Sequence, residues 1–222
     1  MDVFELMRQR HSVRQYKDIE VEVEKRRIID DYVNDLNAKA DLHMQCFYDE
    51  KKCFDHFLAH YGKFENASNY LSLVGKRADD LDERCGYYGE LVVLKLQELG
   101  LNSCWVALSH GKSKAVIDKE EKEVVIIAFG YGENQGHSHK SKEVKEVCDD
   151  FEEMPDWFQR GVEAALLAPT AVNQQKFRFV LFDDHKVKII IPKIGSCLKI
   201  DKGIVKCHFE LAAGKENFHW IE

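Results

Sequence analysis

A polar segment that follows an apolar helix carries the residue types best suited to holding a planar ligand. Residues 168–175 read Ala-Pro-Thr-Ala-Val-Asn-Gln-Gln, and the alternating run 176–182 follows them. Because Pro169 lacks an N–H and clashes with the preceding turn, we expect the helix to end there. Asn173 and Gln175 each offer a carbonyl acceptor and an NH2 donor, which suits a ring edge of alternating donors and acceptors. An ordinary polar loop whose amides cap backbone groups explains the same residues equally well.

A short basic stretch near the N-terminus could hold a phosphate group. Residues 8–14 read Arg-Gln-Arg-His-Ser-Val-Arg, in a chain whose formal net charge is −7. Arginine forks match phosphate oxygens in pairs, and a serine hydroxyl adds a donor. A local cluster of this kind in an acidic chain indicates a specific phosphate-bearing ligand, since nucleic-acid binders usually show a wider basic face. A solvated basic turn that pairs with surface carboxylates is the alternative.

A third segment, Gly100-Leu101-Asn102-Ser103-Cys104-Trp105, follows a strongly apolar helix. Small polar residues beside a tryptophan could line one face of a flat ligand. The simpler interpretation is a turn that ends the helix, with Trp105 in the core. Gly130-Tyr131-Gly132 also follows an expected strand, but the next glycine is residue 136 and not 135. This spacing does not match the dinucleotide fingerprint.

Composition narrows the class of protein. The 222 residues are 45% hydrophobic and 32% charged, which is typical of a soluble globular protein. No run approaches the roughly 20 apolar residues that span a membrane. The first residues lack the basic-then-apolar order of a signal peptide. We therefore expect a cytoplasmic protein that binds neither nucleic acid nor membrane.

The cysteines and histidines indicate neither a disulfide framework nor a metal centre. The seven cysteines are odd in number, and none has the C-x-x-C spacing of a zinc site or redox dithiol. We expect reduced thiols, several of them buried. His137 and His139 form a lone H-x-H in a lysine-rich stretch, with no third ligand in sight. The sequence predicts no metal site.

The spacing of apolar residues predicts a mixture of helices and strands. Helices are expected over 3–8, 22–37, 89–99, 114–121, 155–168 and 203–213. Strands are expected over 45–48, 70–74, 124–129, 177–182 and 187–191, the last two as a hairpin. The fold class is therefore α+β, with helices around one central, mostly antiparallel sheet. Residues 132–150 are polar and without apolar period, so the single domain expected over 1–222 could consist of two halves joined by residues 133–150.

Taken together, the three segments resemble the nitroreductase family of flavin enzymes. Arg10-His11-Ser12-x-Arg14 is similar to the family's phosphate motif, and Gly89–Trp105 to its central interface helix with the loop after it. Ala168–Gln175 resembles its flavin-contacting loop. That loop lies roughly 160 residues after the first motif, whereas the family usually leaves a few dozen, which indicates a rearranged branch. Lys176-Phe177 also replaces the family's usual Pro-Trp.

The resemblance implies a homodimeric, nitroreductase-like fold that binds FMN noncovalently. Arg8, Arg10, His11 and Ser12 would hold the phosphate, and Arg14 would reach the ribityl chain or the pyrimidine side of the ring. The family's C-terminal basic pair has no clear counterpart, and Lys199, Lys202 and Lys206 are the candidates. The expected cofactor-binding residues are Arg8, Arg10, His11, Ser12, Arg14, Ser103, Cys104, Trp105, Pro169, Thr170, Ala171, Asn173 and Gln175.

The implied reaction is a transfer of hydride from NAD(P)H to the flavin, and then of electrons to a small nitroaromatic, quinone or similar electron-poor acceptor. No catalytic side chain is expected, because the flavin carries the chemistry. Two alternatives stay open. One is a specialised flavin enzyme of the same fold, for dehalogenation or flavin fragmentation. The other is a non-catalytic flavin-binding protein.

Overall fold

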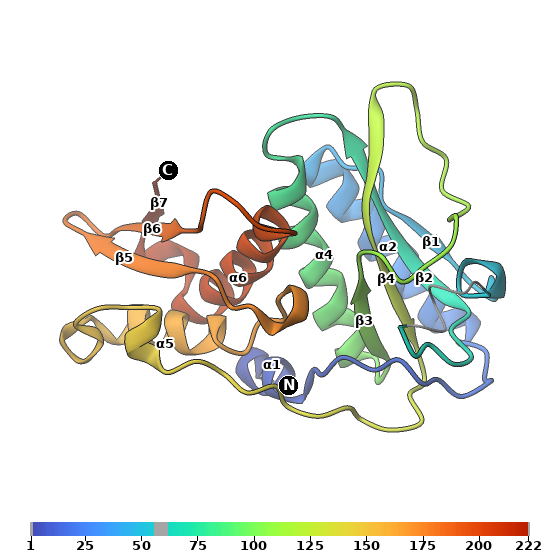
Figure 1. Ribbon diagram of the computed structural model, residues 1–222, viewed down its shortest axis with the longest axis horizontal. Coiled ribbons are helices and arrows are strands. Elements are labelled where there is room, and N and C mark those ends of the chain that lie inside the picture. Colours follow the sequence, from blue (N-terminus) through green and yellow to red (C-terminus); the bar gives the residue numbers. More distant parts are fainter. Residues whose placement is uncertain (1, 56–61, 222) are drawn as a thin grey trace. The chain divides into compact units, whose positions relative to one another are not determined.

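The computed structural model describes residues 2–55 and 62–221. The chain divides into two compact units. The first unit comprises Gln9–Leu81 and Leu91–Ser138, and the second comprises Met1–Arg8, Asp82–Glu90 and His139–Glu222. Helix α4 (Leu81–Glu98) contributes residues to both. Figure 1 shows the order of the helices and strands along the chain.

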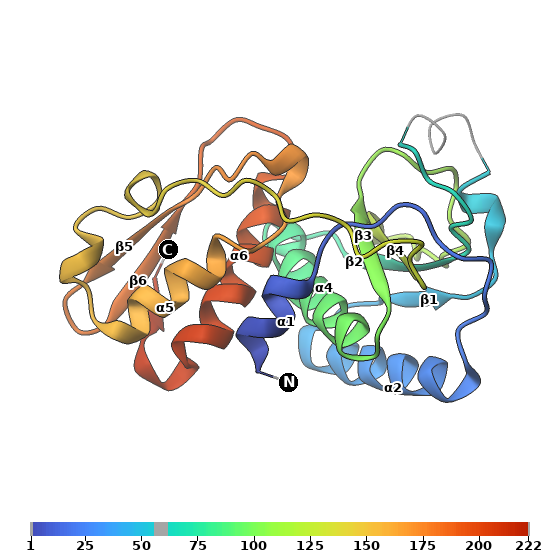
Figure 2. The same cartoon turned by 90° about the horizontal axis from the view of Figure 1, so that it is seen from below.

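The first unit is built on a four-stranded antiparallel sheet with strand order β1-β2-β4-β3. The strands are β1 (Gln45–Phe47), β2 (Asn69–Lys76), β3 (Asn102–Val106) and β4 (Glu121–Gly130). Helix α2 (Val23–Ala40) runs along one face of the sheet, as Figure 2 shows. Every residue of β2 except the last is buried, so this strand is covered on both faces.

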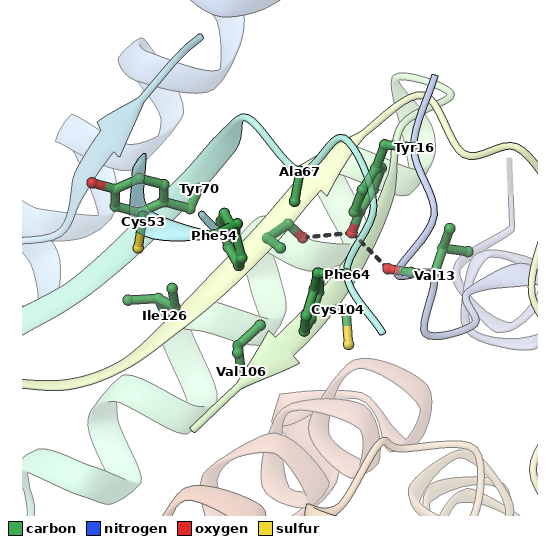
Figure 3. Packing of buried hydrophobic residues seen from close by; sticks show 11 residues of the cluster. Val13, Tyr16, Cys53, Phe54, Phe64, Ala67, Tyr70, Cys104, Val106 and Ile126 are labelled. Carbon is green, nitrogen blue, oxygen red and sulfur yellow. Dashed lines mark hydrogen bonds between the residues drawn. The ribbon is translucent and has the colours of Figure 1, made fainter. Parts of the chain in front are cut away.

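The face of the sheet away from α2 carries a cluster of aromatic and small apolar side chains (Figure 3). Phe47, Tyr70, Ala128 and Cys104 are successive partners across β1, β2, β4 and β3, so they form one row on this face. Phe47 and Tyr70 stack with ring centroids 4.9 Å apart. The whole cluster consists of Val13, Tyr16, Cys53, Phe54, Phe64, Ala67, Tyr70, Cys104, Val106, Ile126 and Ala128.

The second unit packs two helices and a three-stranded sheet around a dense set of aromatic rings. Its elements are α1 (Val3–Gln9, whose last residue falls in the first unit), α5 (Asp156–Ala165), α6 (Leu198–Ala213), β5 (Arg178–Phe182), β6 (Lys186–Ile190) and β7 (His219–Trp220). Strand β6 pairs antiparallel with β5 and parallel with β7. Phe209 of α6 stacks on Phe179 at 4.7 Å and meets Phe158 of α5 edge-on at 5.5 Å. These rings fix α6 between α5 and the sheet.

Helices α4 and α6 approach so closely that their contact requires glycine on both sides. A Cβ on Gly86 would lie 2.1 Å from the carbonyl oxygen of Ile200, and a Cβ on Gly203 would lie 2.0 Å from that of Glu83. Both distances are far inside van der Waals contact, so any side chain would force the helices apart. Glu83 also accepts from the ammonium groups of Lys202 and Lys206 at 2.7 and 2.9 Å.

Five single turns of 3-10 helix complete the described elements. They are η1 (Lys51–Cys53), η2 (Val144–Glu146), η3 (Phe151–Glu153), η4 (Ala171–Asn173) and η5 (Lys215–Asn217). The α+β class is confirmed, and so is the hairpin around residues 183–186. The expected single sheet is wrong, because the strands form two separate sheets. A boundary between the two units falls between Ser138 and His139, inside the polar run. That the chain forms a single domain stays a prediction.

The helix expected over 114–121 is also wrong. The backbone N–H groups of this stretch go to side chains of other segments: Lys114 donates to the Tyr70 hydroxyl at 2.9 Å and Val116 to the Gln45 side chain at 2.9 Å. Strand β4 already begins at Glu121. These bonds satisfy the backbone outside a helix, which periodicity alone does not reveal.

The helix expected over 89–99 begins much earlier, at Leu81, because the contact with α6 stabilises a first half that contains Gly86 and Gly89. None of the seven cysteines forms a disulfide in the part of the chain that the structure describes. Across residues 2–55 and 62–221, no helix has both the length and the apolar character needed to cross a bilayer.

Glu210 ties the C-terminal strand to α6, and we predict that its charge stabilises the fold. Its carboxylate accepts from the Tyr87 hydroxyl at 2.6 Å and from Trp220 Nε1 at 2.8 Å, and it pairs with Lys215 at 3.2 Å. Burial alone would raise the pKa of Glu210, but these three partners together hold it below its ordinary value.

A carboxyl whose pKa is lowered by folding adds stability above its unfolded pKa, and this stability is lost as the pH falls through the folded pKa. Glu210→Gln should therefore lower the free energy of unfolding by about 2 kcal/mol at neutral pH, the scale of hydrogen bonds to a charged group. The difference from wild type should shrink below about pH 4. Urea unfolding at several pH values measures both effects, and a pH-independent difference would contradict the charged role.

Candidate functional site

The basic N-terminal segment lies against the outer edge of the first sheet. Ser12 pairs with Ser103 in a parallel bridge, and the Val13 N–H donates to the Ser103 carbonyl at 3.0 Å. The hydroxyl of Tyr16 donates to the Val13 carbonyl at 2.6 Å and lies 3.3 Å from the Ala128 carbonyl oxygen (Figure 3). The segment is therefore held at both ends of its turn, beside the strand that carries the third predicted segment.

The loop after β4 closes over the other side of this segment. His11 donates from Nδ1 to the Gln135 carbonyl at 3.1 Å, and Gly132 N–H donates to the Asn102 side chain at 3.0 Å. Gly136 has a φ of +70°, and a Cβ there would lie 2.7 Å from His11 Cβ. Glycine is required at 136 both for the left-handed backbone and for this close approach. Gly132 and Gly136, whose spacing does not match a dinucleotide fingerprint, thus help to hold the basic segment in place.

The thiol of Cys104 marks where three predicted phosphate ligands gather. Burial raises the pKa of the Cys104 thiol, while the charge of Arg14, a hydrogen bond from Ser12 and the charge of Arg10 act in the opposite direction. Ser12 therefore acts on the thiol by a hydrogen bond, and the two arginines act on it through their charge. Ser12 and Arg14 are exposed, whereas Arg10 is buried, with 4% of its surface accessible.

The predicted turn at 100–105 is a strand from Asn102 onward, which separates its side chains. Cys104 points into the hydrophobic cluster, and the alternation of a strand places Ser103 and Trp105 on the opposite face. Ser103 and Cys104 are both buried and Trp105 is half-buried. The ring of Trp105 is therefore the most accessible of the three side chains, because Ser103 and Cys104 are buried and the Ser103 carbonyl is already bonded to Val13.

The amide loop of the second unit holds an uncommon backbone conformation. Val172, Asn173 and Gln175 have φ of 47°, 54° and 43°, and Val172 is 97% exposed. A left-handed conformation is rare for a β-branched residue, and it costs on the order of 1–3 kcal/mol where the surroundings enforce it. The loop thus carries strain that burial of Val172 does not offset.

Asp201, in the first turn of α6, holds this strained shape. Its carboxylate accepts from the Ala171 N–H at 3.0 Å and from Gln174 Nε2 at 2.7 Å. Gln174 also donates to the Ser196 carbonyl at 3.0 Å. Burial raises the pKa of Asp201, while the bonds from Ala171 and Gln174 oppose that rise.

The amides of Asn173 and Gln175 bind the segment 140–142. Gln175 Nε2 donates to the Lys140 carbonyl at 2.9 Å and to Asn173 Oδ1 at 2.9 Å, and Gln175 Oε1 accepts from the Lys142 N–H at 2.8 Å. Both N–H groups of the buried Gln175 amide are therefore engaged within the chain. Asn173 is exposed and gives one N–H to the Lys140 carbonyl at 3.0 Å, and its Oδ1 accepts from Gln175 Nε2.

The remaining predicted residues divide between the two units. Arg8 is exposed at the end of α1, where it lies 3.9 Å from Glu5 and over the Phe4 ring. Pro169, Thr170 and Ala171 are half-buried, and Thr170 Oγ1 accepts from the Gln175 N–H at 3.0 Å. The basic segment and β3 belong to the first unit, whereas Arg8 and residues 169–175 belong to the second.

Sequence reasoning missed Lys140 and Lys142. Their backbone is bonded to the amide loop, and the described residues include no carboxylate in an ion pair with either ammonium group. Of the cations expected instead, Lys202 and Lys206 both pair with Glu83. In the sequence, both lysines stand in the lysine-rich run around His137 and His139. The described residues contain no cluster of three metal-ligating side chains.

A family model described as "Putative TM nitroreductase" matches residues 2–213, almost the whole chain. The chain belongs to the nitroreductase family. This is the family that the three segments predicted, and membership of it supports an oxidoreductase. No curated protein matches it.

Solved structures show the same fold. The chain is similar to a "putative nitroreductase" from Thermotoga maritima MSB8, with 24% identity over 97% of this chain and 85% of that one, at a TM-score of 0.70. It is similar, at a TM-score of 0.52, to a "putative NADH dehydrogenase/NAD(P)H nitroreductase" from Parabacteroides distasonis ATCC 8503. That match has 17% identity and covers 66% of this chain and 96% of that one. The nitroreductase-like fold class is thus confirmed.

Removing the Asp201 carboxylate should release the amide loop without unfolding the protein. We predict that Asp201→Ala speeds hydrogen exchange of the amides of residues 171–175 about tenfold or more, since a lost charged hydrogen bond is worth on the order of 1.5–3 kcal/mol. Exchange measured by mass spectrometry checks this. Glu210→Gln, which removes a buried charge from the other end of α6, is the matched control. Equal protection of residues 171–175 from hydrogen exchange in wild type and Asp201→Ala would contradict the role of Asp201 in holding the loop.

Proposed function

We propose that this protein is an FMN-dependent oxidoreductase that takes hydride from NAD(P)H and reduces nitroaromatic, quinone or similar electron-poor small molecules. The match to the family model over residues 2–213 carries the proposal. The chemistry of the side chains at the two ligand segments fits FMN: cations and a hydroxyl for a phosphate, and amides for a ring edge.

We assign the phosphate end of FMN to the basic segment, residues 8–14. Ser12 and Arg14 are exposed, and the charges of Arg10 and Arg14 both act on the Cys104 thiol. Their backbone is fixed by the bridge to Ser103 and by the Tyr16 hydroxyl. An arginine whose backbone is already ordered loses less conformational entropy when its guanidinium group binds an anion. Arg10 and Arg14 would neutralise phosphate charge, and Ser12 would donate a hydrogen bond to it.

We assign the flavin ring of FMN to the amide loop, residues 168–175. Asn173 is exposed and gives one N–H to Lys140, so its second N–H would be the one to bond a ligand. Gln175 would position the site without contacting the ring, because its amide holds Asn173 and the segment 140–142 in place. These residues would orient a ring by hydrogen bonds and transfer no proton.

Lys140 and Lys142 would add positive charge beside the amide loop. Because the Lys140 carbonyl and the Lys142 N–H are bonded to Gln175, the backbone of both lysines stays beside the amide loop. A cation near a flavin stabilises negative charge on the reduced ring or on the phosphate. We therefore include both lysines among the cofactor-binding residues.

The bound FMN would supply the redox chemistry, accepting hydride and passing electrons on. The part left to the chain is binding, orientation and electrostatics. This agrees with a site that is rich in guanidinium, ammonium and amide groups and that includes no acid–base pair among the residues proposed above.

Purification and a titration test the proposal directly. We expect yellow protein, or protein that takes up added FMN, with absorbance near ~450 nm that is bleached by NADH or NADPH. Flavin binding without bleaching by either nucleotide would favour a specialised flavin enzyme or a flavin-binding protein. Colourless protein that refuses FMN would exclude all of these functions.

Arg10→Ala should weaken FMN binding by about 1.5–3 kcal/mol, the scale of a charge-assisted hydrogen bond, which corresponds to roughly ten- to 150-fold in Kd. Because Arg10 is buried, Arg14→Ala at an exposed position serves as a second test that spares the fold. Arg27→Ala, on the exposed face of α2, is the matched control. Fluorescence titration of FMN measures all three, and unchanged affinity in both Arg10→Ala and Arg14→Ala would place the phosphate elsewhere.

A further inference from the structure

Val172 combines a strained backbone with an almost wholly exposed aliphatic side chain. Its φ of 47° and ψ of 28° place a β-branched residue in the left-handed region, and 97% of its surface is accessible. Packing within the chain therefore does not offset the strain. Residues held in rare conformations cluster at sites that bind ligands. Because Val172 belongs to the loop to which we assign the flavin ring, its side chain is available to a second ligand at the same place.

Ile194, on the loop between β6 and α6, is a second large aliphatic side chain left exposed, with 89% of its surface accessible. The Gln174 side chain joins this loop to the amide loop, since its Nε2 donates to the Ser196 carbonyl at 3.0 Å. Asp201, in the first turn of α6, accepts from the same Gln174 amide at 2.7 Å. Val172 and Ile194 each lie two residues before one end of the Gln174–Ser196 bond, on loops that are held to the same turn of helix.

The three segments that meet here are uniformly basic. Gln175 bonds the segment 139–142 to the amide loop, and Gln174 bonds the amide loop to the segment 191–197. Residues 139–142, 168–176 and 191–197 contain no aspartate or glutamate, although the chain has 39 acidic and 32 basic residues. The same segments contain the lysines Lys140, Lys142, Lys176 and Lys193.

Two of these lysines are not yet assigned to the flavin. Lys176 follows the amide loop directly, and Lys193 directly precedes Ile194; both are exposed. Across the described residues, no carboxylate forms an ion pair with either ammonium group. The carboxylate of Asp201 is close to both loops, but it is buried, with 6% of its surface accessible, and bonded to the amide loop. The exposed side chains at this place are therefore aliphatic and cationic.

We propose that these two loops bind the electron acceptor, and that Val172, Ile194, Lys176 and Lys193 select acceptors in which an aromatic ring carries an anionic group. The acceptor role rests on the proposed function, whereas the chemistry of the ligand rests on the exposed side chains. A ring placed on the two aliphatic groups removes apolar surface from water. The lysines add specificity, because they attract an anion and give no such advantage to a neutral or cationic ring.

Equilibrium titrations of the FMN-loaded protein without NAD(P)H, so that no turnover occurs, test the charge preference. Para-nitrobenzoate and para-nitrobenzamide are matched probes, because they share the nitroaromatic ring and differ in charge. The double variant Lys176→Glu, Lys193→Glu should weaken nitrobenzoate binding roughly fivefold or more and change nitrobenzamide binding by less than about twofold.

The double variant Lys39→Glu, Lys119→Glu is the matched control, since it changes the net charge equally at exposed positions of the first unit. It should leave the affinity for both probes unchanged. Equal weakening of nitrobenzoate binding in the two double variants, or none in either, would overturn the role of Lys176 and Lys193.

Val172→Asn tests the apolar contact separately. Asparagine tolerates the left-handed backbone, so Tm should equal or exceed that of wild type. Both probes should bind roughly threefold or more weakly, because the aliphatic contact is lost. Unchanged affinity would overturn the contact. A wild-type dimer that Val172→Asn converts to a monomer in sedimentation velocity would also overturn it, by assigning this side chain to a subunit interface.

The acceptor site and the flavin function fail in distinguishable ways. FMN binding with no preference for nitrobenzoate over nitrobenzamide would overturn the acceptor selectivity and leave the flavin function standing. If the protein refuses FMN, the same titrations are made on the protein as purified. Nitrobenzoate binding that still depends on the two lysines would then support the anionic aromatic site and refute the flavin function, whereas no binding of either FMN or nitrobenzoate would refute both.

Discussion

The second unit depends on one steric constraint, the close approach of α4 and α6 at Gly86 and Gly203. With a hydrogen atom in place of a side chain on both helices, the backbones touch and Glu83 reaches Lys202 and Lys206. The position of α6 then fixes the rest. Asp201 lies in its first turn and holds the amide loop. Toward its C-terminal end, Phe209 packs among the aromatic rings and Glu210 bonds the C-terminal strand. A single close contact therefore sets the place of three separate anchors.

Much of this fold could be predicted from the sequence, because the strongest signals were local. The apolar spacing of α2, the continuous run of β4 and the turn between β5 and β6 all depend on neighbouring residues. The extent of α4 could not be predicted in the same way. Gly86 and Gly89 weaken helix propensity, and only the contact with a helix more than 100 residues later compensates for them.

The ligand segments were recognised by residue type, but their division of labour was not visible in the sequence. Asn173 and Gln175 look equivalent as amides, and only the structure shows that Gln175 is buried with both N–H groups engaged while Asn173 is exposed. Lys140 and Lys142 lay in a polar run that carried no periodic pattern. Their link to the amide loop comes from backbone hydrogen bonds, which leave no mark on the residue types involved.

The position of the basic segment along the edge of β3 has a consequence for solubility. Strand β3 is at the edge of its sheet, and an edge strand presents unpaired N–H and C=O groups to which another chain can add. Ser12 and Val13 cover part of that edge through the bridge to Ser103 and the bond to its carbonyl. The residues proposed to hold phosphate thus also guard the sheet against pairing with a neighbouring molecule. Selection for a soluble protein would keep this segment in place even in a relative that had lost its ligand.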